Sequence, residues 1–183
     1  LENFHRERPL ERGMRREELR TRLLPRTDLQ LADLVIDSLG AAGYLETTTG
    51  LVCRKGFAVS LSEEEKSVIA ELASLFTASA YTPPGIEEIT AQFGKRANIG
   101  QVLSLLISNG TLIRLTPQIL MPEELVNQAW EIAQSTIAET GQITLADFRD
   151  KLSTTRKFAI ALLEYFDKQR KTKLVGDARV FYA

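Results

Sequence analysis

Three segments of the chain repeat one pattern of apolar and polar positions. In each, apolar residues recur at i, i+3 and i+4, which is typical of an amphipathic helix, and a turn with a short strand is expected to follow. Gly43 and Gly110 stand where a helix end favours a left-handed residue, and Arg170 holds that place in the third copy. The helix and the segment after it are residues 33–39 and 40–45, 102–107 and 108–113, and 161–167 and 168–175.

Two further sets of helices complete the repeat. Longer helices separate the copies, one from about Ser62 to Phe76 and the other from about Pro122 to Ala138. Ser62 is followed by a glutamate three residues later, as in a capping box. The whole pattern recurs about every 60 to 70 residues. Shorter amphipathic helices are expected at residues 16–23, 86–93 and 145–152.

This order of elements is that of a helix-turn-helix with a wing. We therefore expect a mainly α protein with small β-hairpins (α+β), made of tandem winged-helix modules in an extended arrangement. Each module is small, so neighbours are expected to pack together and extend their cores. Residues 1–12 are expected to be only a polar lead-in, with His5 at the surface. The expected modules are residues 1–75, 76–135 and 136–183.

Composition favours a globular protein without catalytic chemistry. The chain has 183 residues, of which 44% are hydrophobic and 26% charged, and this excludes a disordered or fibrous protein. A single histidine, a single cysteine and the lack of a phosphate-binding G-x-x-x-x-G-K-[ST] loop or a metal-ligand cluster argue against an enzyme. Cys53 cannot form an internal disulfide, which fits a reducing compartment. No apolar run is long enough for a membrane span, so we expect a soluble, cytoplasmic protein.

Charge is distributed unevenly along this nearly neutral chain. Residues 1–61 carry a net charge of +1, residues 62–140 of −6 and residues 141–183 of +4. Such asymmetry indicates a basic end that binds a polyanion. An ordinary solvated surface is the alternative reading of the same charges.

The second helix of each copy decides between these readings. Its start has mixed charge in the first copy (residues 26–33), and contains Lys95 and Arg96 within an acidic module in the second. In the third copy, hydroxyl residues that can cap the helix are followed at once by Arg156 and Lys157. Free N–H groups, the positive end of the helix dipole and two cations together favour a phosphate. The candidate RNA-binding residues, which include the wing, are Lys151, Thr154, Thr155, Arg156, Lys157, Arg170, Lys171, Lys173, Gly176, Asp177 and Arg179.

Residues 154–159, 162–167 and 175–180 resemble the last module of the bacterial selenocysteine-specific translation elongation factor family, SelB, and residues 9–20 resemble the start of an earlier module. The resemblance covers essentially the whole chain. In that family a GTPase body binds selenocysteinyl-tRNA, and an arm of four winged helices holds an mRNA hairpin, the selenocysteine insertion element. The resemblance implies that this chain is the second to fourth winged helices without the GTPase body.

The resemblance also implies roles for single residues and for partners. Thr155, Arg156 and Lys157 match the Ser/Thr-Arg-Lys at the start of the family's last recognition helix. The wing is matched by Gly176, Asp177 and Arg179, whereas Arg170 and Leu174 depart from it, since a glycine and a further basic residue are common there. The implied partners are the mRNA hairpin and, through the full-length factor, the ribosome and selenocysteinyl-tRNA. GTP and magnesium are expected only for the GTPase body, and this chain is expected to be a monomer without cofactors.

An α-helix cannot enter the deep, narrow major groove of A-form RNA, so sequence must be read from loop bases. We expect Arg156, Lys157 and the wing cations to bind phosphates on either side of a hairpin loop, with a flipped base near Thr155. Trp130 is expected to be a packing residue on a long helix. The alternatives are a DNA-binding winged-helix regulator, which would retain affinity for duplex DNA, and a protein-interaction scaffold, which would not bind nucleic acid in a salt-dependent way.

Overall fold

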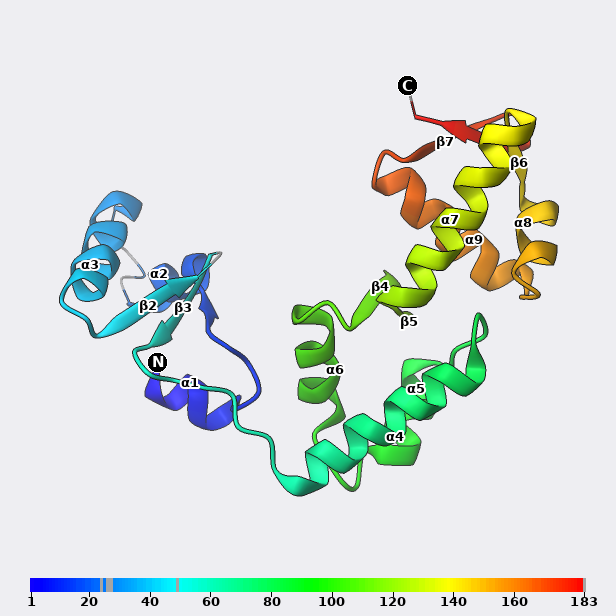
Figure 1. The fold of residues 1–183 in the computed structure, drawn as a ribbon. Coiled ribbons are helices and arrows are strands. Elements are labelled where there is room, and N and C mark those ends of the chain that lie inside the picture. Colours follow the sequence, from blue (N-terminus) through cyan, green and yellow to red (C-terminus); the bar gives the residue numbers. More distant parts are fainter. Residues whose placement is uncertain (24, 26–27, 49, 183) are drawn as a thin grey trace. The chain divides into compact units, whose positions relative to one another are not determined.

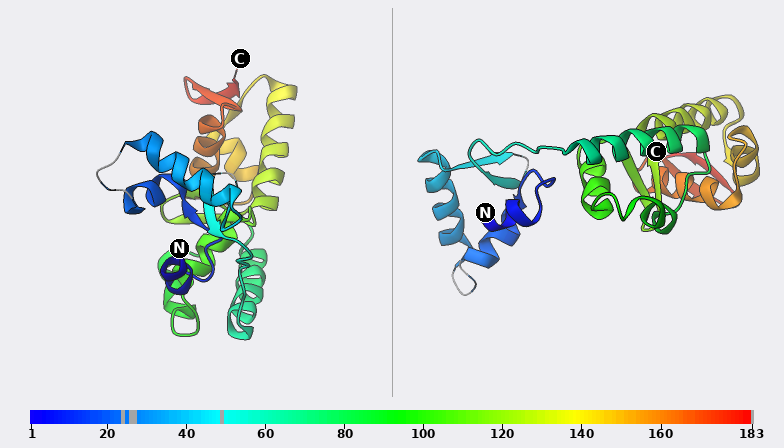
Figure 2. Two further views of the ribbon diagram at one scale, coloured as in Figure 1. Left: turned by 90° about the vertical axis from the view of Figure 1, so that its left-hand side faces the viewer. Right: turned by 90° about the horizontal axis from the view of Figure 1, so that it is seen from below.

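The computed structural model describes residues 1–23, 25, 28–48 and 50–182. The chain forms two compact units, Leu1–Glu63 and Glu64–Ala183, which are described separately (Figure 1, Figure 2). Both units consist of helices and small antiparallel sheets, which confirms the expected α+β class. In the described ranges, no helix combines the length and the hydropathy that crossing a membrane requires.

The first unit is a winged helix. Its three-stranded antiparallel sheet has the order β1-β3-β2. Phe4, Met14, Leu19, Ile36 and Val52 form its core, so the three helices and strands β1 and β3 each contribute a buried side chain. Its elements are α1 (Glu2–Glu7), β1 (Met14–Arg15), α2 (Arg16–Leu23), α3 (Leu29–Ala41), β2 (Leu45–Thr48) and β3 (Leu51–Arg54).

The N-terminal segment is part of this core and not a polar lead-in. Helix α1 buries Phe4 and His5, and the His5 ring stacks on Phe57 with ring centroids 3.6 Å apart. The backbone N–H of Arg54 donates a hydrogen bond to His5 Nε2 (3.4 Å). The expectation of a surface histidine was therefore wrong, because a short helix with two ring side chains completes the first core.

The second unit contains the other two copies of the repeat. Strands β4 and β5 form a hairpin, and the last sheet has the antiparallel order β6-β8-β7. Gly110 and Arg170 have positive φ angles of 83° and 55° at the expected helix ends, as does Gly43 in the first unit (76°). Its elements are α4 (Glu63–Ser79), α5 (Ile86–Phe93), α6 (Ile99–Ser108), β4 (Leu112–Thr116), β5 (Ile119–Pro122), α7 (Glu123–Thr140), β6 (Ile143–Thr144), α8 (Leu145–Lys151), α9 (Arg156–Lys168), β7 (Thr172–Val175) and β8 (Ala178–Phe181).

The hydrophobic core of the last module includes the hairpin of the middle module. Leu115 and Met121 of the middle hairpin lie in the same buried cluster as Phe148 and Phe166 of the last module. The prediction that neighbouring modules pack to extend their cores is confirmed here. Because its apolar residues are buried, the middle hairpin is a packing element of the last module and not a free wing.

The division of the chain differs from the module boundaries expected from sequence. Residue 75 lies inside α4, and residue 135 lies inside α7. Helix α4 belongs to the second unit, to which it is tied by Arg96, whose guanidinium binds Glu64 (2.6 Å) and Glu71 (2.8 Å). The two compact units divide between Glu63 and Glu64, at the first residue of α4, and the module boundaries at residues 75 and 135 stay predictions.

Candidate nucleic-acid interface

The start of α9 is open to solvent. Its N-cap, Thr155, has an extended backbone, and in the described part of the chain its side chain makes no capping hydrogen bond. The next two residues, Arg156 and Lys157, are exposed, and the first turn contains no acidic residue. Unpaired N–H groups and two cations thus face solvent together, an arrangement that favours an anion.

The corresponding helices of the other modules begin differently. The Asp28 carboxylate accepts a hydrogen bond from the N–H of Gln30 at the start of α3 (2.9 Å). The Asn98 side chain accepts one from the N–H of Gln101 at the start of α6 (3.3 Å). A negative cap already occupies the anion position of α3, and a neutral cap occupies that of α6. The predicted start of the first copy also included Arg26 and Thr27, which lie outside the described residues.

The basic residues of the middle module are partly used within the protein. Arg96 is bound by Glu64 and Glu71 of α4, and its guanidinium lowers the pKa of the Glu71 carboxyl by hydrogen bonding. Arg96 is thus paired with carboxylates of its own module. Lys95, next to it in sequence, is exposed.

The candidate cations of the last module fall into two groups. Arg156 and Lys157 lie at the start of α9, whereas Arg170, Lys171 and Lys173 follow its end; all five are exposed. A helix of 13 residues spans about 18 to 20 Å, so one continuous cluster does not form. We call the first pair the helix-start cations and the other three the wing-base cations.

Arg179 is buried and serves the fold. Its side chain is only 10% exposed, and Nε lies 3.4 Å from a carboxylate oxygen of Asp167. The hydroxyl of Thr172 donates to the other oxygen of Asp167 (2.6 Å). This network fastens both strands of the wing to the last turn of α9. This burial argues against the prediction that Arg179 binds RNA, because its guanidinium is already engaged by Asp167. A resemblance in sequence could not reveal that contact.

The remaining wing candidates form the tip of the hairpin. Gly176 has a φ of 59° and is exposed together with Asp177 between β7 and β8. A left-handed backbone at this position favours glycine. The tip is therefore placed by its backbone conformation and can approach a ligand closely.

Thr154 is also engaged within the protein. Its hydroxyl donates a 2.6 Å hydrogen bond to the backbone carbonyl of Tyr81, which lies in the loop after α4. Tyr81 is partly buried against the shared core. The middle module thus braces the turn that leads into α9, a link between residues 73 positions apart that the sequence pattern did not indicate.

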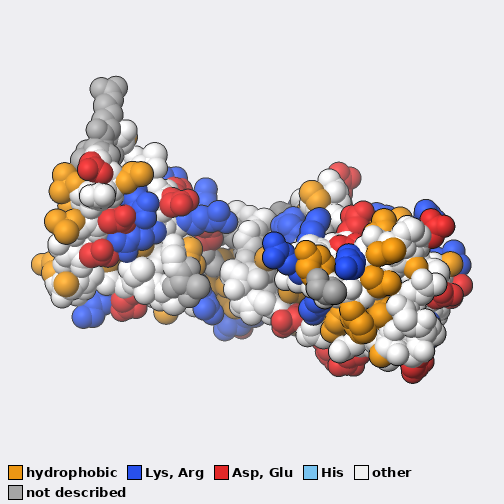
Figure 3. All heavy atoms as spheres, turned by 90° about the horizontal axis from the view of Figure 1, so that it is seen from above, with side chains coloured by type: hydrophobic (Ala, Val, Ile, Leu, Met, Phe, Trp, Pro, Cys, Tyr) orange, Lys and Arg blue, Asp and Glu red, His pale blue; other side chains and the backbone are white. Residues whose placement is uncertain are grey.

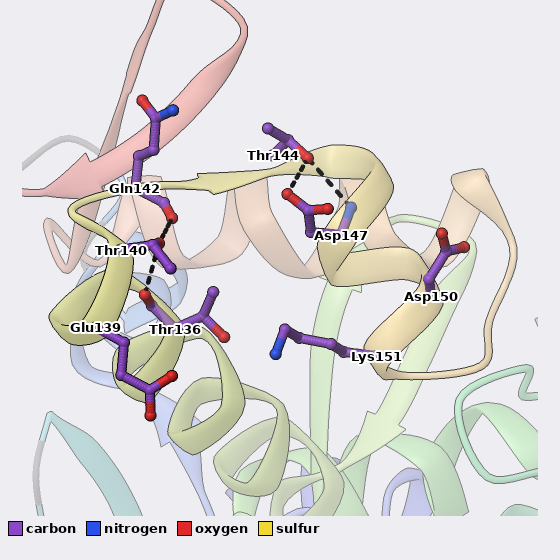
Figure 4. A pocket seen from close by; sticks show the side chains of 8 residues that line it. All are labelled: Thr136, Glu139, Thr140, Gln142, Thr144, Asp147, Asp150 and Lys151. Carbon is purple, nitrogen blue, oxygen red and sulfur yellow. Dashed lines mark hydrogen bonds between the residues drawn. The ribbon is translucent and has the colours of Figure 1, made fainter.

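Lys151 lies apart from the helix-start cations. It ends α8 and lines a shallow pocket of about 470 Å³ between α7, β6 and α8. Figure 4 shows its side chain extending across this pocket toward α7, beside the side chain of Thr136. The pocket also contains the carboxylates of Glu139, Asp147 and Asp150, so its surroundings disfavour a phosphate more than those of Arg156 do.

Two family models match the chain, over residues 1–52 and 135–181, and together they cover more than half of it. Both are described as elongation factor SelB, winged helix. The chain belongs to the SelB family. The models represent the second and the third winged helix of that factor, and the ordinal numbers expected above for the three modules stay predictions.

Sequence relatives and solved structures that are similar to this chain are also selenocysteine-specific elongation factors or a domain of one. The chain is 25% identical to the selenocysteine-specific elongation factors of Desulfomicrobium baculatum, over 98% of its length, and of Escherichia coli, over 97%. It spans 28% of the length of each of them. The mRNA-binding domain of E. coli SelB, solved in complex with SECIS RNA, is similar in fold (TM-score 0.57, 22% identity, 67% of this chain and 100% of that chain). A bacterial selenocysteine-specific elongation factor has a similar fold over 93% of this chain and 26% of its own (TM-score 0.53, 17% identity).

Proposed function

We propose that this chain binds an mRNA hairpin of the selenocysteine insertion type through its last module. Membership of the SelB family supports the proposal, as does the fold shared with a SelB domain that was solved with SECIS RNA. Within a full-length factor, the bound hairpin would tether a GTPase body that carries selenocysteinyl-tRNA to the ribosome, so that UGA is read as selenocysteine. The chain itself would bind and position, with no catalytic step.

The observation that carries the proposal is the open start of α9. Its first turn has no acidic residue and no side-chain cap, and the exposed side chains of Arg156 and Lys157 would reach a phosphate bound at the N–H groups of that turn. The wing-base cations Arg170, Lys171 and Lys173 supply a second contact beyond the other end of the helix. Phosphate contacts at both places would provide affinity, and unpaired loop bases would provide specificity.

The test is binding of a selenocysteine-insertion hairpin and of a loop-scrambled control across a range of salt concentrations. Five exposed cations that each neutralise one phosphate predict a log–log salt slope of about −3.5. Replacing Arg156→Ala together with Lys157→Ala should weaken binding by about 30- to 300-fold and reduce the slope to about −2. Lys95→Ala is the matched control, because this exposed lysine stands before the second helix of the middle module.

Three results would contradict the proposal. Equal binding of the double variant and the wild-type chain would exclude the start of α9 as the site. Tighter binding of duplex DNA than of the hairpin would favour a DNA-binding regulator. Absence of salt-dependent binding to any nucleic acid would favour a protein-interaction scaffold.

A further inference from the structure

The outer face of the last sheet exposes an aromatic ring. Directly opposed residues of an antiparallel pair share a face, and successive residues alternate between faces. Ile143 pairs with Arg179, and both are buried on the inner face. Lys173 pairs with Val180 on the outer face. Two residues further along, the N–H of Tyr182 donates to the carbonyl of Lys171, so Tyr182 continues the outer row.

Solvent reaches much of this row. The side chain of Tyr182 is 49% exposed, and Val175 on the same face is 56% exposed. Figure 3 views the molecule from the side on which the wing lies, and there hydrophobic side chains of the second unit adjoin Lys and Arg side chains. Val175 pairs with Ala178 and Tyr182 with Lys171, so the two exposed apolar side chains lie at opposite ends of the row with Lys173 between them.

Lysines accompany the aromatic rings of this region. Lys173 Nζ lies 5.9 Å from the ring centroid of Tyr182. Lys171, which is paired with Tyr182, places its Nζ 4.8 Å from the ring centroid of Trp130 on α7. The expected packing role of Trp130 agrees with its half-buried ring, which meets Phe166 edge-on at 5.2 Å. Tyr182 differs from Trp130 because about half of its side chain is exposed.

Helix capping accounts for only part of this arrangement. Cations in the last turn of α9 and just beyond it stabilise the negative end of the helix dipole, which explains Lys168 and Arg170. It does not explain why an aromatic ring and a valine remain exposed beside Lys171 and Lys173 on a strand face. Exposed aromatic rings between cations are the usual platform for single-stranded nucleic acid, because bases stack on the rings while the cations contact the backbone.

We propose that Tyr182 is a stacking platform for one unpaired nucleotide of the bound RNA, with Lys171 and Lys173 on the adjacent phosphates. This inference rests on the proposed function and adds a base-stacking contact with the RNA, separated from the helix-start cations by the length of α9. The positive charge around the ring selects a polyanion over an apolar protein segment. On binding, Lys173 moves from the Tyr182 ring toward a phosphate and leaves the ring to the base.

Stacking and charge can be separated by experiment. Tyr182→Leu keeps an apolar side chain but removes the ring, so it should weaken hairpin binding about tenfold while the salt slope stays unchanged. Tyr182→Phe should bind within about twofold of the wild type, since stacking needs no hydroxyl. Lys173→Ala should instead reduce the slope by about 0.7. Tyr44→Leu is the control, because Tyr44 is an exposed tyrosine of the first unit.

A fluorescent base locates the nucleotide. With 2-aminopurine placed at each unpaired position of the hairpin in turn, one position should be quenched by the wild-type chain and by Tyr182→Phe, but not by Tyr182→Leu. Wild-type affinity and quenching in Tyr182→Leu would overturn this inference, while loss of binding in the Arg156/Lys157 double variant would leave the proposed function standing. If the double variant also bound normally, the proposed function would fall and this inference with it.

Discussion

Helices α3 and α9 occupy the same place in the repeat and have the same length of 13 residues, yet their surfaces differ. Helix α3 begins at the carboxylate of Asp28 and exposes apolar side chains, among them Leu31 and Leu34. Helix α9 begins at an unused threonine cap, followed by two exposed cations. The fold therefore supplies a helix with an exposed start in both modules, and two or three side chains decide whether that start can receive an anion.

The charged residues around α3 and α9 differ in the same way as the starts of the two helices. Asp33 of α3 is bound by Arg16 (2.6 Å) and Arg20 (2.9 Å) of α2, and Arg16 also binds Asp37 (2.7 Å). The hydrogen bonds from Arg16 and Arg20 lower the pKa of Asp33. The first unit thus pairs its charges internally across the helix-turn-helix, whereas the last module leaves Arg156 and Lys157 exposed to solvent. Net charge alone does not distinguish a binding site from a paired surface; the partners of each charge do.

The sharpest test transfers the cap of α3 to α9. Thr155→Asp should raise the free energy of unfolding by about 1 kcal/mol, because the carboxylate caps the first turn and interacts with the helix dipole. The same carboxylate would occupy the anion position, so affinity for the hairpin should fall by at least about tenfold. Urea unfolding and RNA titration measure the two effects.

A neutral cap separates these effects. Thr155→Asn should give a similar stabilisation with a much smaller loss of affinity, because it adds no negative charge. If Thr155→Asp bound RNA as tightly as the wild type, the difference between α3 and α9 would have no bearing on anion binding.

A second test, on Arg179, distinguishes a cation that stabilises the fold from one that binds RNA. Arg179→Met should lower the free energy of unfolding of the second unit by about 1–3 kcal/mol, because the carboxylate of Asp167 loses a charged partner at a largely buried place. The salt slope of RNA binding should stay the same. A slope reduced by about 0.7 with unchanged stability would instead return Arg179 to the set of phosphate contacts.

The smallest effect is expected in the first unit. Burial lowers the pKa of His5 from its ordinary 6.5, with a smaller contribution from the charge of Arg54, so the folded state favours neutral histidine. The unfolded chain then binds more protons below pH 6.5, so stability falls as the pH drops through that value. Protonation would also place a hydrogen on Nε2, which accepts from Arg54.

Amide exchange of β3 between pH 7 and pH 5, corrected for intrinsic exchange rates, measures this loss in the first unit. His5→Phe retains a ring against Phe57 and should show no such pH dependence. The amides of α9 serve as the internal control, because His5 is the single histidine of the chain. Equal pH dependence in both variants would exclude His5 as its source.

Much of the fold followed from local signals. The apolar spacing of α3, α6 and α9 predicted each helix, and the glycines after the first two predicted their left-handed ends, because period and backbone conformation depend on near neighbours. The expectation that residues 1–12 are only a polar lead-in was wrong, because local spacing does not show which distant residues a short helix packs against. Helix α1 spans only six residues, and its stability comes from packing His5 against Phe57, a contact between residues far apart in the chain.

In the candidate site, too, the features set by neighbouring residues could be predicted, and those set by tertiary contacts could not. Exposure of Arg156 and Lys157 followed from their place at a helix start, whereas the partners of Thr154 and Arg179 could not be foreseen. Tyr182 was overlooked because strand pairing decides which face of the sheet it occupies. A contact of this kind depends on which elements pack together, and the spacing of residues in one segment carries no information about that.

The sequence by itself determined the repeat, its helices and turns, and the basic end of the chain, since each is a property of neighbouring residues. Only the tertiary structure decided which charges remain available. Arg96, Arg16 and Arg179 are held by carboxylates from other elements, and the middle hairpin is buried in the core of the last module. The physical reason is that a charge is neutralised, or a side chain buried, by whatever the fold brings within a few ångströms of it, and distance along the chain does not set that distance in space.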